Sequence, residues 1–318
     1  MTQQINVIGD ARYVPLLDKA FVGLIDVMGT DASIVQAARV SYGAGTKTVN
    51  EDRGLIRYLL RHLHTTPFEM CELKFHVRMP IFVARQWLRH RTASVNEESA
   101  RYSEMTDEFY FPAPDDIQPQ SSDNKQGRNG EVSFKNREGV TWVMDAAYEV
   151  AYKAYQTLLG EKVENFYDLH GDGDDSILSK DFDGVARELA RVVMPVASYT
   201  EFYWKVNLHN LFHFLKLRAD PHAQKEIRVF AEAMIELARK NFPVAVEAWE
   251  DYIKNALTIS RMEVETLRYL LSSDDNKQQF LGDYAKSKTD KDFAKRFSAE
   301  YGMNTREMTD FGRKFLDE

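Results

Sequence analysis

The stretch CELKFHVRMPIFVARQWLRHR, residues 71–91, carries the clearest strand signal in the chain, followed at once by a helix signal. Apolar side chains occupy every second position of its first part: Cys71, Leu73, Phe75, Val77 and Met79. A period of two predicts a strand with one buried face and one polar face. Pro80 suits the first turn of a helix, which we expect over 81–91.

Strands and helices are predicted on both sides of this stretch. Strands are expected at 5–9, 21–29 and 198–208, and helices at 31–42, 51–66, 140–160, 184–194, 209–218 and 221–256. Asp31 is a candidate N-cap, Pro67 is expected to stop the helix before it, and Pro243 to kink or break the last helix. Residues 112–139 are rich in Pro, Gly, Ser, Asp and Asn and read as an exposed insertion. This mixture predicts an α+β fold.

The last part of the chain, 258–318, reads as four short helices, several of which open with a capping residue. Each carries few apolar residues, too few for an independent core but enough to pack on a neighbour. Charges of both signs are interspersed, which disfavours a nucleic-acid-binding arm. We therefore expect a main domain over 1–257 and a helical C-terminal extension over 258–318.

Bulk composition excludes several classes of protein. The net charge of -8 over 318 residues disfavours a general DNA or RNA binder, whose affinity depends on neutralising phosphates. Cys71 is the single cysteine, which fits a reducing compartment. The N-terminus lacks a secretory signal, and no apolar run approaches the roughly 20 residues that span a bilayer. We expect a cytoplasmic protein with neither a membrane nor a nucleic-acid partner.

A cationic cluster surrounds the polar loop RHRTASVNEESARYS, residues 89–103. The cluster contains Arg89, His90, Arg91 and Arg101. Arginine suits phosphate because its planar fork donates two parallel hydrogen bonds. The alternative is a solvated helix end whose arginines pair with Glu97 and Glu98.

A second candidate region is NLHNLFHFLKLRAD, residues 207–220. Helical spacing brings Asn207 and Arg218 to a common side. His209 and His213 are separated by four residues, as in a metal-binding pair, but no glutamate stands between them and no third ligand is evident, so we expect no metal. The alternative is a packed helix whose histidines form local hydrogen bonds.

These residues resemble the flavin-dependent thymidylate synthase family. RHRTASVNEESARY, residues 89–102, meets every fixed position of the family signature RHRxxSxNExSxRY. The resemblance extends to residues 37–42, to HTTPFE, PIFVARQW and ARVVMP, and to VNLHNLFHFLKLRADPHAQKEI. It covers roughly residues 15–250 and includes neither the insertion nor the tail.

The resemblance implies a single catalytic α+β domain with a small mixed or antiparallel sheet and long helices. It implies an enzyme that makes dTMP from dUMP, with methylenetetrahydrofolate as carbon donor, FAD as redox carrier and NADPH as reductant. It also implies a homotetramer whose active sites are shared between subunits. A non-catalytic nucleotide- or RNA-binding module that uses the same arginines is the rival interpretation.

Motif matches also imply roles for individual residues. The dUMP contacts are expected from Gln86, Arg89, Ser99, Arg101, Arg191 and Arg218, of which Arg218 lies against the uracil and is the catalytic candidate. The FAD site is expected to include Ser41, Thr66, Arg89, His90, Arg91, Glu97, Asn207, His209 and His213. Further candidates near flavin and folate are His64 and Tyr102. Some members carry arginine in place of His209 and asparagine in place of His213.

Overall fold

The computed structural model describes residues 10–40, 49–122, 125, 127–163, 178–179, 181–303 and 305–316. The strand predicted at 5–9 and the candidate Ser41 lie outside the described residues. The chain divides into two compact units, Met1–Lys254 and Asn255–Glu318. No helix among the described residues is long and apolar enough to cross a membrane.

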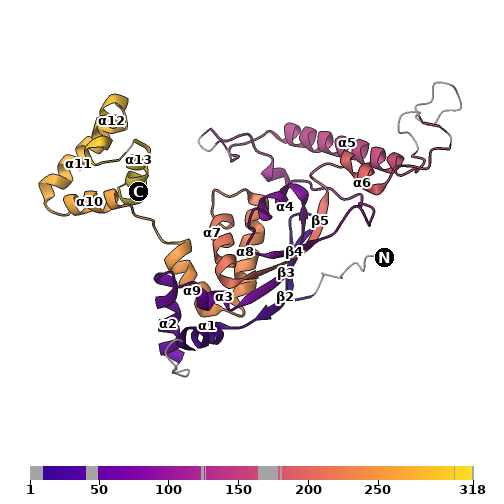
Figure 1. The fold of residues 1–318 in the computed structure, drawn as a ribbon. Helices are drawn as coiled ribbons and strands as arrows, with labels where there is room; N and C mark the ends of the chain where they lie inside the picture. Colours follow the sequence, from indigo (N-terminus) through magenta and orange to yellow (C-terminus); the bar gives the residue numbers. More distant parts are fainter. Residues whose placement is uncertain are drawn as a thin grey trace. The chain divides into compact units, whose positions relative to one another are not determined.

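The first unit is built on a five-stranded sheet with the order β1-β2-β3-β5-β4. Figure 1 labels four of these strands, β2 to β5. Its strands are β1 (Tyr13–Leu16), β2 (Ala20–Met28), β3 (Glu72–Pro80), β4 (Ser94–Glu97) and β5 (Tyr199–Asn207). All four neighbouring pairs are antiparallel, so the sheet is antiparallel throughout. The predicted inward face of β3 is confirmed, because its alternate apolar side chains from Cys71 to Met79 are fully buried.

Strand β4 is an element that the sequence did not predict, since residues 94–97 read as part of a polar loop. It pairs with β5 at the edge of the sheet, with Ser94 opposite Lys205 and Glu97 opposite Phe202. All four of its residues are exposed. A strand with no buried face has no alternating apolar pattern, which explains the error.

Helices cover the sheet and extend beyond it. In the first unit they are α1 (Asp31–Arg39), α2 (Val49–Arg61), α3 (Thr66–Glu69), α4 (Ile81–Trp87), α5 (Phe134–Leu158), α6 (Arg187–Ala190), α7 (Leu208–Arg218), α8 (Lys225–Arg239) and α9 (Pro243–Trp249). Shorter turns are η2 (Pro114–Asp116), η3 (Arg191–Val193) and η4 (Glu250–Lys254). The fold is α+β, as predicted.

The helix boundaries near Asp31, Pro67 and Pro243 differ from or refine the prediction. The N-cap of α1 is Thr30 rather than Asp31, which lies in the first turn. Helix α2 ends well before Pro67, because the chain turns at Leu63 with a φ of 58°; Pro67 lies in the first turn of α3. The break at Pro243 is confirmed, since α8 ends at Arg239 and α9 begins at the proline.

The core lies between the sheet and helices α4, α7, α8 and α9 (Figure 1). Trp87 of α4 is fully buried at its centre. Its ring centroid lies 4.5 Å from that of Phe214 on α7 and 5.3 Å from that of Trp204 on β5. These aromatic contacts fix α4 and α7 against the same face of the sheet.

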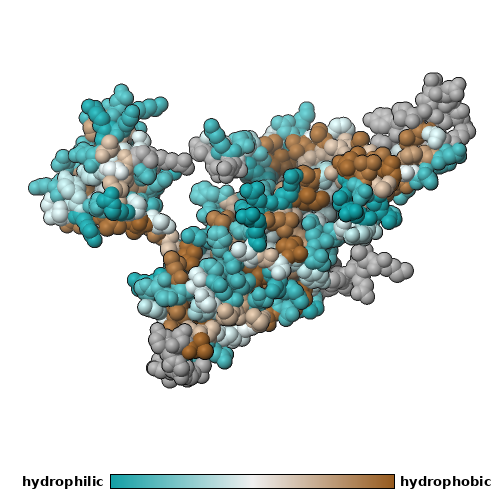
Figure 2. Space-filling view, viewed as in Figure 1, coloured by the Kyte–Doolittle hydropathy of each residue, from teal (hydrophilic) through white to brown (hydrophobic). Residues whose placement is uncertain are grey.

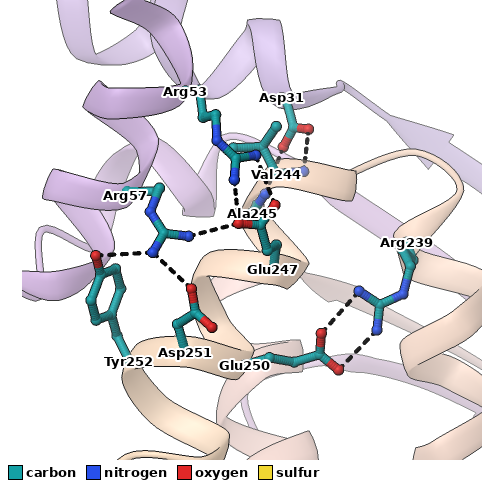
Figure 3. Close-up of polar contacts among 10 residues, drawn as sticks. All are labelled: Asp31, Arg53, Arg57, Arg239, Val244, Ala245, Glu247, Glu250, Asp251 and Tyr252. Atoms are coloured by element: carbon teal, nitrogen blue, oxygen red, sulfur yellow. Dashed lines mark hydrogen bonds and ion pairs between the residues drawn. The ribbon is translucent and has the colours of Figure 1, made fainter. Parts of the chain in front are cut away.

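Ion pairs join α2 to the end of the first unit (Figure 3). Arg57 reaches Glu247 at 2.9 Å and Asp251 at 2.7 Å, and Arg53 also pairs with Glu247. Beside them, Asp31 accepts hydrogen bonds from the backbone N–H groups of Val244 and Ala245 at the start of α9. A carboxylate at a helix N-terminus satisfies donors that have no partner within the helix.

The second unit contains α10 (Arg261–Leu270), α11 (Asp274–Ser287), α12 (Lys291–Glu300) and α13 (Thr305–Phe315). The prediction that its helices lack a core of their own is wrong. Its buried side chains form one cluster: Leu270, Phe280, Tyr284, Phe297, Met303, Met308 and Phe311. The prediction counted the apolar residues of each helix separately, whereas residues from all four helices form one shared core. Lys314 of α13 also bonds Glu263 of α10 at 2.6 Å.

Candidate active site

The candidate site lies where helices α4 and α7 meet. Each helix follows one of two paired strands, and the two helices leave those strands at opposite ends. Helix α4 follows β3 directly, and α7 follows β5, its antiparallel neighbour. Because both helices pack on the same sheet face, the residues at their C-terminal ends come together. Arg218, the last residue of α7, thereby reaches Gln86 and His90.

Arg218 is held in a fixed orientation by this contact. Its Nε donates to Nε2 of His90 over 3.1 Å, and its Nη2 donates to the backbone oxygen of Gln86 over 3.3 Å. Neither partner is a carboxylate, and Arg218 forms no ion pair within the described part of the chain. Burial lowers the pKa of Arg218 below its ordinary value. The result is a partly buried, oriented guanidinium whose charge is not neutralised by a neighbouring acid.

His90 is a neutral imidazole at this contact. Arg218 can only donate, so Nε2 of His90 accepts and its proton lies on Nδ1. Burial, together with the charges of Arg218 and His213, lowers the pKa of His90 to about 4. The His90 ring also meets Phe214 edge-on, with centroids 4.9 Å apart. His90 therefore orients Arg218 without adding charge.

The surface next to Arg218 is cationic and open. Arg89 and Arg91 are exposed, and neither forms an ion pair with any residue that the structure describes. The predicted alternative, in which they pair with Glu97 and Glu98, is wrong: Glu97 accepts from the hydroxyl of Thr200 at 2.6 Å, and the Glu98 backbone bonds to β5. Two unpaired arginines in an acidic chain are suited to an anionic ligand.

Arg101 and Arg191 both contact Glu188 of α6, and Ser99 contacts the backbone of Arg101. Arg101 forms an ion pair with the Glu188 carboxylate at 3.0 Å, and Arg191 donates to the Glu188 backbone oxygen at 3.4 Å. The Ser99 hydroxyl accepts from the Arg101 backbone N–H at 3.3 Å. Tyr102 is 79% exposed. Among the described residues, no hydrogen bond or ion pair joins this group to Arg218, so one chain presents two separate clusters.

The remaining candidates are distributed over other elements. Thr66 begins α3 and is exposed, and His64, just before it, stacks on Tyr58 with ring centroids 6.1 Å apart. Asn207 caps α7, its side-chain oxygen accepting from the Asn210 N–H at 2.9 Å. His209 is partly exposed on α7.

His213, one turn further along α7, is exposed and faces His90, with ring centroids 5.9 Å apart. The described residues contain no group of three or more His, Cys, Asp or Glu side chains that could hold a metal ion. Burial raises the pKa of the Cys71 thiol to about 11, which makes it a poor nucleophile.

Gln224 is a contact residue that the sequence did not indicate. It is the N-cap residue of α8, and its side-chain oxygen accepts from the side-chain amide of Gln86. The two residues lie 138 positions apart, and neither stands in a periodic pattern that would predict the contact.

Comparison with known proteins identifies the family. Residues 23–244 match the family described as thymidylate synthase complementing protein. The chain is 50% identical to a flavin-dependent thymidylate synthase of Rickettsia bellii over 262 residues, which cover 82% of this chain and 86% of that protein. The chain belongs to the flavin-dependent thymidylate synthase family.

Other relatives agree with this assignment. The flavin-dependent thymidylate synthase of Ruegeria pomeroyi is 50% identical over 85% of this chain and 84% of its own length. Among solved structures, the UMP/dUMP methylase PolB of Streptomyces cacaoi, bound with 5-Br dUMP, is similar with a TM-score of 0.63 and 34% identity. That match covers 76% of this chain and 99% of the methylase.

Proposed function

We propose that the protein is a flavin-dependent thymidylate synthase that converts dUMP to dTMP, with methylenetetrahydrofolate as carbon donor and NADPH as reductant. The observation that carries this proposal is Arg218, a cation oriented by Gln86 and His90 next to the unpaired Arg89 and Arg91. The family and the similarity to a dUMP methylase support the same reaction. The rival interpretation, a nucleotide- or RNA-binding module without catalysis, finds no support in these relatives.

Two groups of residues are proposed to bind dUMP. Arg101, beside Ser99, and Arg191, which shares the partner Glu188 with it, supply two cations that suit the phosphate. Phosphate binding by Arg101 requires that it exchange its exposed ion pair with Glu188, which costs little because exposed pairs contribute about 0–1 kcal/mol. Gln86, Arg89 and Arg218 are proposed to hold the uracil end.

Arg218 is proposed to act on the uracil ring. Carbon 5 of uracil is a poor nucleophile until the ring gains electron density. A guanidinium already fixed beside the ring favours the form with negative charge at N3 and the adjacent carbonyl, and no reorganisation is needed during the reaction. His90 keeps this guanidinium oriented because it accepts from Nε.

The residues present fit FAD. Arg89 and Arg91 have no acidic partners within the described part of the chain, and His213 of α7 faces His90, which lies between them in the sequence; a diphosphate needs such donors. We propose that Arg89, His90, Arg91, Glu97, Asn207, His209, His213, Thr66 and Ser41 hold this cofactor. Bound FAD, reduced by NADPH, supplies the hydride for the product methyl group. His64 and Tyr102 are proposed to lie near flavin and folate.

Assembly into a cytoplasmic homotetramer with shared active sites is part of the proposal. Exposed apolar residues gather on α5, including Phe134, Trp142 and Val143, and α6 and η3 beside it add Leu189 and Val192 (Figure 2). A hollow of about 640 Å³ lies along α5, and Phe111 and Trp142 are among the residues that line it. These residues are distant from Arg218 in the sequence. Apolar patches of this kind mark protein–protein contacts, and the two separate clusters of substrate residues would be completed by such a contact.

Flavin content tests the proposal. Purified protein should be yellow, release FAD on denaturation and oxidise NADPH. A colourless protein that takes up no added FAD and oxidises no NADPH would favour the binding-module interpretation.

A further inference from the structure

An ion pair between the partly exposed Arg128 and the buried Glu226 joins the insertion to the first turn of α8. Arg128, from the 112–139 segment, donates from Nη2 to Oε1 of Glu226 over 2.6 Å. Glu226 is only 1% exposed, and the same oxygen accepts from the hydroxyl of Tyr110 at 3.0 Å. Its second oxygen, Oε2, is buried and has no hydrogen-bond partner among the described residues. Arg128 therefore supplies the positive charge that compensates the buried carboxylate of Glu226, which has few other hydrogen-bond partners.

The charge state of Glu226 depends on this partner. Burial opposes ionisation, but the hydrogen bond from Arg128 and a backbone donor of the helix overcome it, so the pKa of Glu226 is lowered below its ordinary value. Breaking a buried pair by removing one partner leaves a charge without compensation. The first turn of α8 therefore depends on a residue that lies 98 positions earlier in the chain.

The insertion is shaped to present Arg128. Arg128 pairs with Gln120 in a short antiparallel bridge, and the Asn129 N–H bonds the Pro119 oxygen at 3.1 Å. The Gln120 side-chain amide donates to the Gly127 oxygen at 2.8 Å. A second ion pair, between Asp116 and Lys225, joins the same insertion to the same helix end.

The first turn of α8 is in turn coupled to the substrate residues. Gln224, two positions before Glu226, accepts from the Gln86 side chain, and the Gln86 backbone oxygen accepts from Arg218. Only the short segment 219–224 separates the end of α7 from the start of α8. Two contacts, joined by the two-residue backbone step from Glu226 to Gln224, lead from Arg128 to Gln86, and a third joins Gln86 to Arg218.

We propose that Arg128 is a positioning residue for dUMP, which acts through Glu226 and Gln224 to hold Gln86 and Arg218 in place. The insertion is then part of the substrate site, although it contributes no residue to the family signature. This inference rests on the proposed function, because Gln86 and Arg218 are proposed dUMP contacts.

Arg128→Gln removes the charge and tests the pair. We expect the KM for dUMP to rise about tenfold, with a smaller change in kcat and in FAD affinity, because the series reaches the dUMP contacts Gln86 and Arg218 first and the proposed FAD residue His90 only beyond Arg218. Arg128→Lys should restore most of the dUMP affinity, since one N–H contact is needed. Arg261→Gln is the control, because it removes an exposed ion pair to Glu265 within α10, outside the proposed dUMP and assembly surfaces. It should leave the KM unchanged.

Gln224→Ala tests the second link even if Arg128→Gln fails to fold. Gln224 is exposed, so its truncation should spare the melting temperature, yet it removes the side-chain partner of Gln86 and should raise the KM for dUMP by a similar factor. Hydrogen exchange over residues 219–227 of the unliganded protein gives a readout that does not depend on turnover. Arg128→Gln should increase this exchange and Arg261→Gln should not.

Two results would overturn the inference. The first is an unchanged KM for dUMP in both Arg128→Gln and Gln224→Ala. The second is an equal loss of FAD and dUMP affinity in Arg128→Gln, without rescue by Arg128→Lys, which would indicate a purely structural role. Absence of dTMP synthesis by the unmodified protein would instead contradict the proposed function, and the exchange experiment would still decide whether Arg128 orders this segment.

Discussion

The guanidinium of Arg218 donates from Nε to the neutral Nε2 of His90 over 3.1 Å. This contact fixes both the tautomer of His90 and the plane of Arg218. It also joins the motif RHRTASVNEESARY to α7, two segments 128 positions apart at this contact. The chemistry proposed for the site depends on this orientation, which a more flexible cation would not provide.

Arg218→Lys should retain the fold but lose most turnover. A lysine places a point charge on a flexible stem and cannot donate to both His90 and the Gln86 oxygen in one plane. Loss of one preorganised donor typically reduces kcat by about 10²–10³-fold, and we expect a loss in this range. Initial rates of dTMP formation, with melting temperature and FAD content as controls, measure it. Near-normal turnover would remove Arg218 from the mechanism.

The stability of the protein should fall as the pH decreases from about 6.5 to about 4. The pKa of His90 is about 4 in the folded protein, against roughly 6.5 in an unfolded chain. Between these values the unfolded state binds more protons, so the free energy of unfolding decreases with falling pH. Burial is the main cause that lowers the pKa of His90, and the charges of Arg218 and His213 add to it. Thermal unfolding of the wild type and of His90→Gln across this pH range tests this prediction. If stability depended on pH equally in both proteins, the lowered pKa of His90 would not be its cause.

Ser99→Ala should weaken dUMP binding and leave measurable turnover. The Ser99 hydroxyl lies next to the Arg101 backbone, and no histidine base contacts it among the described residues, so binding rather than nucleophilic attack is expected. Titration with dUMP and steady-state rates separate the two roles. Complete inactivity with intact dUMP and FAD binding would indicate a nucleophile.

Trp142→Asp should dissociate the proposed tetramer. Trp142 is 71% exposed on α5, within the apolar surface assigned to assembly, and a buried charge in such a contact is costly. Light scattering coupled to size exclusion should show smaller species and reduced activity. Lys135→Asp, on the same helix, is the control for added negative charge. A single-chain mass for the wild type would contradict shared active sites.

Truncation after residue 257 should preserve FAD binding and dTMP synthesis. The removed segment carries no proposed site residue, and its helices bury their apolar side chains in a core of their own. We expect the dUMP KM and the flavin spectrum to remain unchanged. A soluble, tetrameric truncation that binds dUMP without turnover would show that the C-terminal extension contributes to the active site.

Much of this architecture follows from local sequence signals. Strand β3 and helix α7 carry clear periodicities, and both are confirmed. Strand β4 could not be predicted because it has no buried face. The pairs Gln86–Gln224 and Arg128–Glu226 could not be predicted because they join segments that only the folded sheet and helices bring together. Motifs located the arginines, whereas the contacts that orient them depend on tertiary packing.

Formation of dTMP is the most direct test of the central claim. The purified protein, loaded with FAD, is incubated with dUMP, methylenetetrahydrofolate and NADPH, and the nucleotide product is quantified by chromatography, with each component omitted in turn. The account predicts dTMP that requires all three substrates and FAD and that falls about a hundredfold or more in Arg218→Lys. Flavin-loaded wild-type protein that binds dUMP but forms no dTMP would contradict it.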